Sequence, residues 1–190
     1  MSEVASIAVE AAPPLALPRP VRWRPSRRLT VLSCAIAFPL LCFFALITLT
    51  GPVVALFIGP VDKVLVDKSA KKLWLMRDGA RVYEVDVSLG KKPVGQKRRE
   101  GDQRTPEGRY HLDWRDAGTD YHRAILVSYP SKVDRARGAQ GGEIMIHGQK
   151  YFWRWFTKSP LTNGCIGVSN IAMDVIWSAT ALGTPIEIRP

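Results

Sequence analysis

The clearest structural signal in this 190-residue chain is the segment Lys72-Leu-Trp-Leu-Met-Arg-Asp-Gly-Ala-Arg-Val-Tyr-Glu-Val-Asp-Val-Ser88. Two apolar runs, the second one interleaved with charged residues, flank the dipeptide Asp78-Gly79. Such a dipeptide favours a two-residue hairpin turn, because both of its residues tolerate a positive φ. We therefore predict a β-hairpin whose second strand, Arg81–Ser88, is half-buried.

Short strand patterns continue on the C-terminal side of this hairpin, and one precedes it. Two long loops, 91–108 and 130–142, interrupt them. A single short helix is predicted over Asn170–Ala179, with Asn170 as its N-cap. Many short strands with one helix predict a mainly β domain over residues 62–189. The further strands are predicted at Lys63–Asp67, Arg109–Trp114, Ala124–Tyr129, Glu143–His147 and Thr184–Ile188.

The N-terminal part predicts a membrane segment. Residues 1–28 form a basic, Ala/Pro-rich tail with little to bury, which we expect to be flexible and cytoplasmic. Residues 29–57 are uncharged and supply the roughly 20 apolar residues that cross a bilayer. Because the arginines precede this run, the positive-inside rule places the following domain outside the membrane. A single-pass anchor in a bacterial inner membrane, with a periplasmic domain, is favoured over a cleaved signal sequence, whose apolar run is usually shorter.

The charge balance narrows the partners. The chain carries a formal net charge of +10, and residues 62–190 contain 22 Lys and Arg against 15 Asp and Glu. Excess positive charge attracts polyanions, which outside an inner membrane are peptidoglycan carboxylates and phospholipid headgroups rather than nucleic acid. A solvated basic surface without a specific partner is the alternative interpretation. The composition predicts no oligomeric state.

The cysteines single out one thiol. Cys34 and Cys42 lie in the apolar run, where Cys behaves as a small apolar residue. Cys165 is then the only thiol of the exported domain and has no disulfide partner there. An unpaired Cys in an oxidising compartment indicates a reactive thiol.

The residues around this thiol suit nucleophilic catalysis. His147-Gly148 ends a predicted strand, and Cys165 lies within Thr162-Asn-Gly-Cys-Ile-Gly-Val-Ser-Asn170. A thiol attacks a carbonyl as thiolate, so it needs a base such as imidazole, and backbone N–H groups must meet the developing oxyanion. Gly164 permits a tight turn beside the thiol. Taken alone, the pair fits a buried Cys and a strand-end His equally well.

This window resembles the L,D-transpeptidase (YkuD-type) catalytic domain family, whose signature is His-Gly followed by Ser/Thr-His-Gly-Cys-Ile/Val-Arg and an Asn. The segments Val87-Ser-Leu-Gly90 and Arg104-Thr-Pro-Glu-Gly-Arg-Tyr110, and the opening hairpin, also match the family. The resemblance covers residues 62–189 and is closest to the YafK-type branch. It implies a β-sandwich with a short helix and no cofactor.

The resemblance also implies roles for individual residues. Cys165 would be the nucleophile and His147 the proton acceptor and donor, oriented by the Gly148 carbonyl. The N–H groups of Gly164 and Cys165 would form the oxyanion hole. We expect Thr162, Asn163 and Asn170 to contact the substrate. We find no metal-ligand cluster, because His111 and His122 both lie in strand-like runs without a second Cys.

Two departures from the family pattern concern specificity. Asn163 replaces the family's second His, and Gly167 replaces an Arg that would contact a substrate carboxylate. We expect Arg104 or Arg137 to supply that contact instead, since guanidinium suits bidentate carboxylate binding; a solvated loop face is the alternative. Four residues between His147 and Cys165 could line a groove or form the core of a cap: Tyr151, Trp153, Trp155 and Phe156.

The function expected from these observations is L,D-transpeptidation of diaminopimelate-containing peptidoglycan stem peptides through a Cys165 thioester. Two alternatives stay open. If water deacylates the enzyme, the product is a peptidoglycan hydrolase of the same fold, which would release wall-attached protein or peptide. If Asn163 and Gly167 abolish catalysis, the domain is a non-catalytic peptidoglycan-binding scaffold.

Overall fold

The computed structural model describes residues 27–151 and 161–190, with side-chain environments from residue 35 onward. The chain divides into two compact units, 1–40 and 41–190. The long helix α1 (Arg27–Ile58) begins in the first unit and ends in the second. All strands belong to the second unit.

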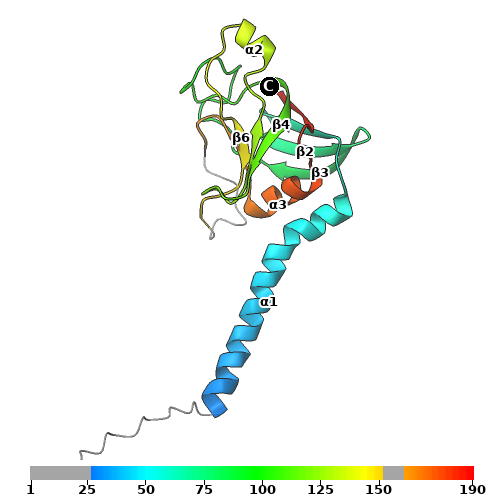
Figure 1. Ribbon diagram of the computed structural model, residues 1–190, viewed down its shortest axis with the longest axis vertical. Helices are drawn as coiled ribbons and strands as arrows, with labels where there is room; N and C mark the ends of the chain where they lie inside the picture. Colours follow the sequence, from blue (N-terminus) through cyan, green and yellow to red (C-terminus); the bar gives the residue numbers. More distant parts are fainter. Residues whose placement is uncertain (1–26, 152–160) are drawn as a thin grey trace, which may run out of the picture. The chain divides into compact units, whose positions relative to one another are not determined.

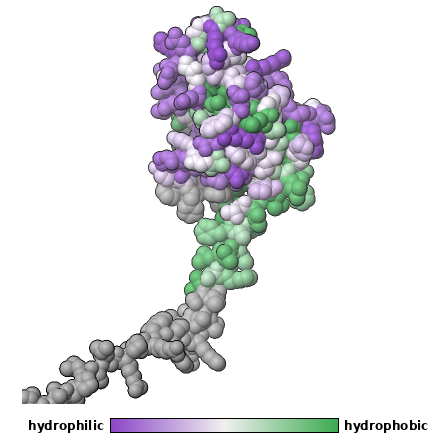
Figure 2. Space-filling view, in the orientation of Figure 1, coloured by the Kyte–Doolittle hydropathy of each residue, from purple (hydrophilic) through white to green (hydrophobic). Residues whose placement is uncertain are grey.

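Helix α1 is long and apolar enough to cross a membrane or to act as a signal sequence. Its segment Ala35–Ile58 has 24 residues and a hydropathy of 2.4, which at 1.5 Å per residue spans about 36 Å, more than the roughly 30 Å of bilayer hydrocarbon. Only 17% of its most apolar window is buried, while Ala55 and Ile58 near its C-terminal end belong to the hydrophobic core. Figure 2 shows the described side chains of α1 as a hydrophobic surface. Its most exposed large side chains are Phe38, Leu41, Leu46, Leu56 and Phe57.

The predicted hairpin is confirmed. Strand β2 (Lys72–Arg77) pairs antiparallel with β3 (Ala80–Asp86), and Arg77 lies opposite Ala80, so Asp78 and Gly79 alone form the turn. Both turn residues have positive φ, 51° and 79°, which gives the turn a twist that matches the twist of its strands.

A single curled sheet of eight strands, in the order β3-β2-β1-β8-β4-β5-β6-β7, confirms the mainly β prediction (Figure 1). The long strand β4 allows the curl, because its first half pairs with β8 and its second half with β5. Two pairs are parallel, β1 with β8 and β6 with β7. The remaining strands are β1 (Lys63–Asp67), β4 (Gly108–Asp116), β5 (Ala124–Val127), β6 (Met145–His147), β7 (Ile166–Gly167) and β8 (Pro185–Arg189).

Helix α3 (Asn170–Ala179) lies beside the strands (Figure 1). Its apolar residues belong to the same core as those of the strands. Its bounds match the prediction, but its N-cap does not. The Ser169 hydroxyl accepts the Ala172 N–H, whereas Asn170 is already helical and 2% exposed. Ser is as good an N-cap as Asn, and the buried Asn side chain is engaged elsewhere, as described below.

Two further expectations are wrong. The segment 130–142 is not all loop, because it contains the one-turn helix α2 (Lys132–Ala136), which Ser131 and Asp134 close with a reciprocal capping box. His122 does not lie in a strand. It has a φ of 70° and precedes β5, where its Nε2 lies 2.7 Å from Asp174 Oδ1 of α3. A contact between distant segments overrides the local pattern at this position.

Candidate active site

The parallel pair of β6 and β7 brings His147 and Cys165 together. Ile146 lies opposite Ile166, and both are fully buried in the core. Because side chains alternate along a strand, His147 points to the opposite face, where Cys165 also lies at the entry to β7. Both residues line one pocket of about 320 Å³. Its lining residues are Lys91, Tyr121, Ala124, Met145, His147, Leu161, Thr162, Asn163 and Cys165.

The imidazole of His147 is held as a neutral base. Its Nδ1 lies 2.8 Å from the carbonyl oxygen of Gly148, which accepts a hydrogen bond, so Nδ1 carries the proton and Nε2 has a free lone pair. Tyr121 packs beside the ring at 4.7 Å between centroids. Burial lowers the pKa of His147 below its ordinary value, and the bond to Gly148 offsets this only in part. A neutral imidazole is the form that can accept a proton.

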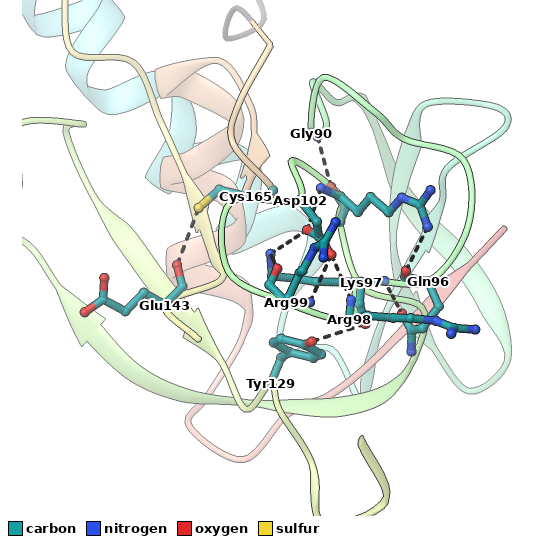
Figure 3. A network of polar contacts seen from close by, with 12 residues as sticks. Gly90, Gln96, Lys97, Arg98, Arg99, Asp102, Tyr129, Glu143 and Cys165 are labelled. Atoms are coloured by element: carbon teal, nitrogen blue, oxygen red, sulfur yellow. Dashed lines mark hydrogen bonds and ion pairs between the residues drawn. The ribbon is translucent and has the colours of Figure 1, made fainter. Parts of the chain in front are cut away.

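The thiol of Cys165 rests protonated. Burial raises its pKa, while the Met145 N–H and the Lys97 charge act in the opposite direction. Its Sγ lies 3.5 Å from the Glu143 carbonyl oxygen, to which it donates (Figure 3). The thiol therefore faces this carbonyl in the resting structure. With a raised thiol pKa and a lowered imidazole pKa, the resting pair is neutral, and attack requires proton transfer to His147.

Thr162 and Gly164 shape the loop that carries the thiol. The Thr162 hydroxyl donates to the Cys165 carbonyl oxygen at 2.7 Å and accepts the Gly164 N–H at 3.0 Å. Gly164 has a φ of 140°, and a Cβ there would lie 2.7 Å from the Arg104 carbonyl oxygen. The Gly164 N–H is thus engaged with the Thr162 hydroxyl. The neighbouring N–H of Cys165 has no acceptor within the described part of the chain.

Asn170 holds the backbone next to His147 in place through a buried hydrogen bond. Its Oδ1 accepts the Gln149 N–H at 2.6 Å, and a Cβ on Gly148 would lie 2.6 Å from the same oxygen. Asn170 is not among the residues that line the pocket. It therefore fixes the backbone segment that contains the Gly148 carbonyl, which orients His147. Because any Cβ at position 148 would collide with Asn170 Oδ1, this arrangement requires glycine there.

The residues predicted to contact substrate are not all brought together. Thr162 and Asn163 line the pocket. Arg104 does not line it, and its Nη1 donates to the Gln96 carbonyl oxygen at 3.3 Å. Arg137 lines a different pocket, together with Arg109, Arg189 and their neighbours. Trp153, Trp155 and Phe156 lie outside the described residues.

Five lining residues were missed by the sequence interpretation: Lys91, Tyr121, Ala124, Met145 and Leu161. Met145 and Tyr121 carry no motif, so only the fold places them. Lys91 had an available signal, because it directly follows the Val87–Gly90 segment that matches the family. Its backbone N–H donates to the Thr162 carbonyl oxygen at 3.1 Å, which attaches this segment to the loop of the thiol.

Comparison with known proteins agrees with this geometry. In sequence, the Escherichia coli K12 protein "Putative L,D-transpeptidase YafK" is 33% identical over 86 residues, 44% of this chain and 31% of that protein. In structure, the helical cell shape determining protein Pgp2 from Campylobacter jejuni is 25% identical, with a TM-score of 0.55 over 73% of this chain and 54% of that chain. Bd1075 from Bdellovibrio bacteriovorus is 28% identical, with a TM-score of 0.53 over 68% of this chain and 48% of that chain.

These relatives are longer proteins, since the match spans about a third of YafK and about half of each solved chain. The family model for the YkuD L,D-transpeptidase catalytic domain matches residues 62–188, which include α2, α3 and all of the sheet except the last residue of β8. The chain therefore belongs to the L,D-transpeptidase catalytic domain family.

Proposed function

We propose that this protein is a cysteine-dependent L,D-transpeptidase that acts on peptidoglycan stem peptides through a thioester on Cys165. The observation that carries the proposal is the shared pocket of His147 and Cys165, with His147 oriented by Gly148. A neutral base and a protonated thiol that line one pocket are the starting state of a general-base mechanism. Family membership supplies the substrate class.

In the first step, Cys165 Sγ attacks the carbonyl carbon at the diaminopimelate L-centre, and its proton passes to His147 Nε2. The oxyanion accepts a hydrogen bond from the Cys165 N–H. Collapse breaks the C–N bond to the terminal D-amino acid, whose amine takes the proton from the imidazolium. An acceptor amine then attacks the thioester, loses a proton to His147, and releases the thiol. Water in place of the amine would give hydrolysis.

The proposed setting is the outer side of a bacterial inner membrane. Five arginines precede the apolar run, and Ala35–Ile58 is long enough to span a bilayer. Anchoring would restrict the domain to the wall layer nearest the membrane.

Mass spectrometry of the full chain in detergent, after incubation with a carbapenem, tests the nucleophile. We expect one covalent adduct on Cys165, which Cys165→Ser abolishes and the control Cys42→Ser retains. His147→Ala should slow its formation. An adduct that survives Cys165→Ser would refute the assignment of the nucleophile.

Muropeptide analysis tests the reaction itself. Incubation with tetrapeptide muropeptides should yield cross-linked dimers with release of the terminal D-amino acid. Shortened monomers without dimers would assign hydrolysis in place of transfer. Unchanged muropeptides, from a folded protein that binds them, would indicate a binding scaffold.

A further inference from the structure

The pocket around Cys165 is complementary to an anion. Its lining is apolar at Ala124, Met145 and Leu161 and polar at Tyr121, Thr162 and Asn163. No Asp or Glu side chain lies among the described lining residues, and Lys91 is their one permanent charge. A stem-peptide donor carries carboxylates close to the bond that breaks, so the charge of this pocket bears directly on how the donor binds.

The backbone of Lys91 is fixed beside the thiol loop. Its N–H donates to the Thr162 carbonyl oxygen at 3.1 Å, and the Thr162 N–H donates to Leu89 at 3.0 Å. Gly90 in between donates to the Thr105 hydroxyl at 3.0 Å, and a Cβ there would overlap the Gln103 carbonyl. Since Thr162 also braces the Cys165 loop, the position of Lys91 relative to the nucleophile is set by the fold.

The ammonium group of Lys91, in contrast to its backbone, is uncommitted. Two other lysines that extend from this part of the fold are buried in ion pairs, Lys97 with Asp102 at 2.9 Å and Lys68 with Glu107 at 2.7 Å. Lys91 is exposed, and its Nζ has no hydrogen-bond or ion-pair partner within residues 35–151 and 161–190. A solvated ammonium on a fixed backbone beside a nucleophile can meet an incoming carboxylate without breaking an existing contact.

The two arginines predicted for this role do not line the pocket. Gly167, at the position where the family pattern has Arg, is buried and its backbone is bonded in both directions to Ser88 at 2.8 Å. Arg104 points to Gln96, and Arg137 lines another pocket. We propose that Lys91 binds a carboxylate of the donor stem peptide and so determines specificity for carboxylate-bearing donors. This inference rests on the proposed function.

The expected effect on the kinetics of the full-length protein follows from the loss of one charge-assisted hydrogen bond. Lys91→Met should raise KM for a tetrapeptide donor about tenfold, with a smaller effect on kcat. Lys91→Arg, which keeps the charge, should recover most of the loss. Lys92→Met is the matched control, because Lys92 is the exposed neighbour that does not line the pocket, and it should behave as wild type.

Donor chemistry identifies which carboxylate is bound. The donors are the tetrapeptide, its C-terminal amide, and the tetrapeptide amidated on the diaminopimelate D-centre carboxylate. One of the two amidated donors should raise KM in wild type as much as Lys91→Met does, and should raise it no further in Lys91→Met. The carboxylate that this donor lacks is the one that Lys91 binds. The proposal is overturned if the ratios of KM among the three donors are the same in wild type and in Lys91→Met.

Binding measured without turnover separates this inference from the proposed function. In the Cys165→Ser background, calorimetry should show tetrapeptide affinity falling about tenfold on Lys91→Met and not on Lys92→Met. If wild type forms no product yet this difference persists, the proposed function fails and the Lys91 assignment stands. If wild type turns over and the two variants bind equally, the Lys91 assignment fails alone.

Discussion

Asp102 is predicted to stabilise the loop between β3 and β4, and Asp102→Asn tests this. Its carboxylate accepts the backbone N–H groups of Arg98 and Arg99 at 2.8 and 3.1 Å, and that of Arg104 at 3.1 Å. The Lys97 ammonium, 4% exposed, adds an ion pair at 2.9 Å (Figure 3). One side chain thus joins both ends of the loop segment that packs against Gly164.

The size of the effect follows from the pKa of Asp102. Burial alone would raise it, but the Arg98 N–H, the Lys97 ammonium and the Arg99 and Arg104 N–H groups together lower it from 3.8 to about 2. The difference between 3.8 and about 2 in the pKa of Asp102 corresponds to about 2 kcal/mol of folding stability. Because the folded-state pKa is depressed, this stability is fully present above about pH 4 and is lost as the pH falls through 2.

The Asn variant loses more than this at neutral pH. It also leaves the buried Lys97 ammonium without its counter-charge, and breaking a buried pair costs about 3–5 kcal/mol. We therefore expect Asp102→Asn to unfold with a free energy about 3 kcal/mol lower than wild type at pH 7. This difference should shrink by about 2 kcal/mol at pH 2, where the wild-type carboxyl is itself becoming protonated.

Urea unfolding of the full chain in detergent, followed by tryptophan fluorescence at pH 7 and pH 2, measures both numbers. Glu100→Gln is the matched control, since it removes a carboxylate from an exposed position in the same loop. The double variant Lys97→Met/Asp102→Asn should recover part of the loss, because it removes the unpaired charge. If Asp102→Asn is no less stable than Glu100→Gln, or if its difference from wild type does not depend on pH, Asp102 does not stabilise this loop in the way described.

Three further predictions concern the site. Gly164→Ala should lower kcat/KM at least tenfold, because its Cβ would lie 2.7 Å from a carbonyl oxygen; wild-type kinetics would contradict this. Asn170→Ala leaves the Gln149 N–H without its acceptor and should lower the unfolding free energy by about 1–3 kcal/mol; unchanged thermal and urea unfolding would argue against it. Because burial lowers the pKa of His147 and the base must be neutral, kcat/KM should fall only below pH 6.5; a midpoint at or above that pH would rule this out.

The sequence pattern predicted an element correctly where the element depends on interactions between residues close together in the chain. The hairpin at Asp78-Gly79 and helix α3 follow from turn stereochemistry and from periodicity within a few residues. The missed elements have other causes. Strand β7 has two residues and exists only because β6 and Ser88 lie beside it. Asn is a residue type that favours the N-cap, but the side chain of Asn170 is buried beside Gly148 and accepts the Gln149 N–H instead.

The site divides in the same way. Cys165 and His147, which line one pocket, were predictable because a lone thiol in the C-terminal domain and a His-Gly at a strand end are visible in the chain itself. Lys91, Tyr121 and Met145 reach the pocket through pairings between segments far apart in sequence. Arg104 and Arg137 have suitable chemistry, and only the tertiary structure shows that both point elsewhere.

The sequence by itself thus determined the mainly β class and the apolar N-terminal helix, and it singled out Cys165 and His147, since each depends on residue type and short-range order. The tertiary structure decided which backbone N–H lacks an acceptor among the described residues beside Cys165, which residue holds the backbone at Gly148 and which cation lines the pocket. These depend on where side chains and backbone groups of separate segments meet, and on which of them are already paired, and neither follows from the order of residues along the chain.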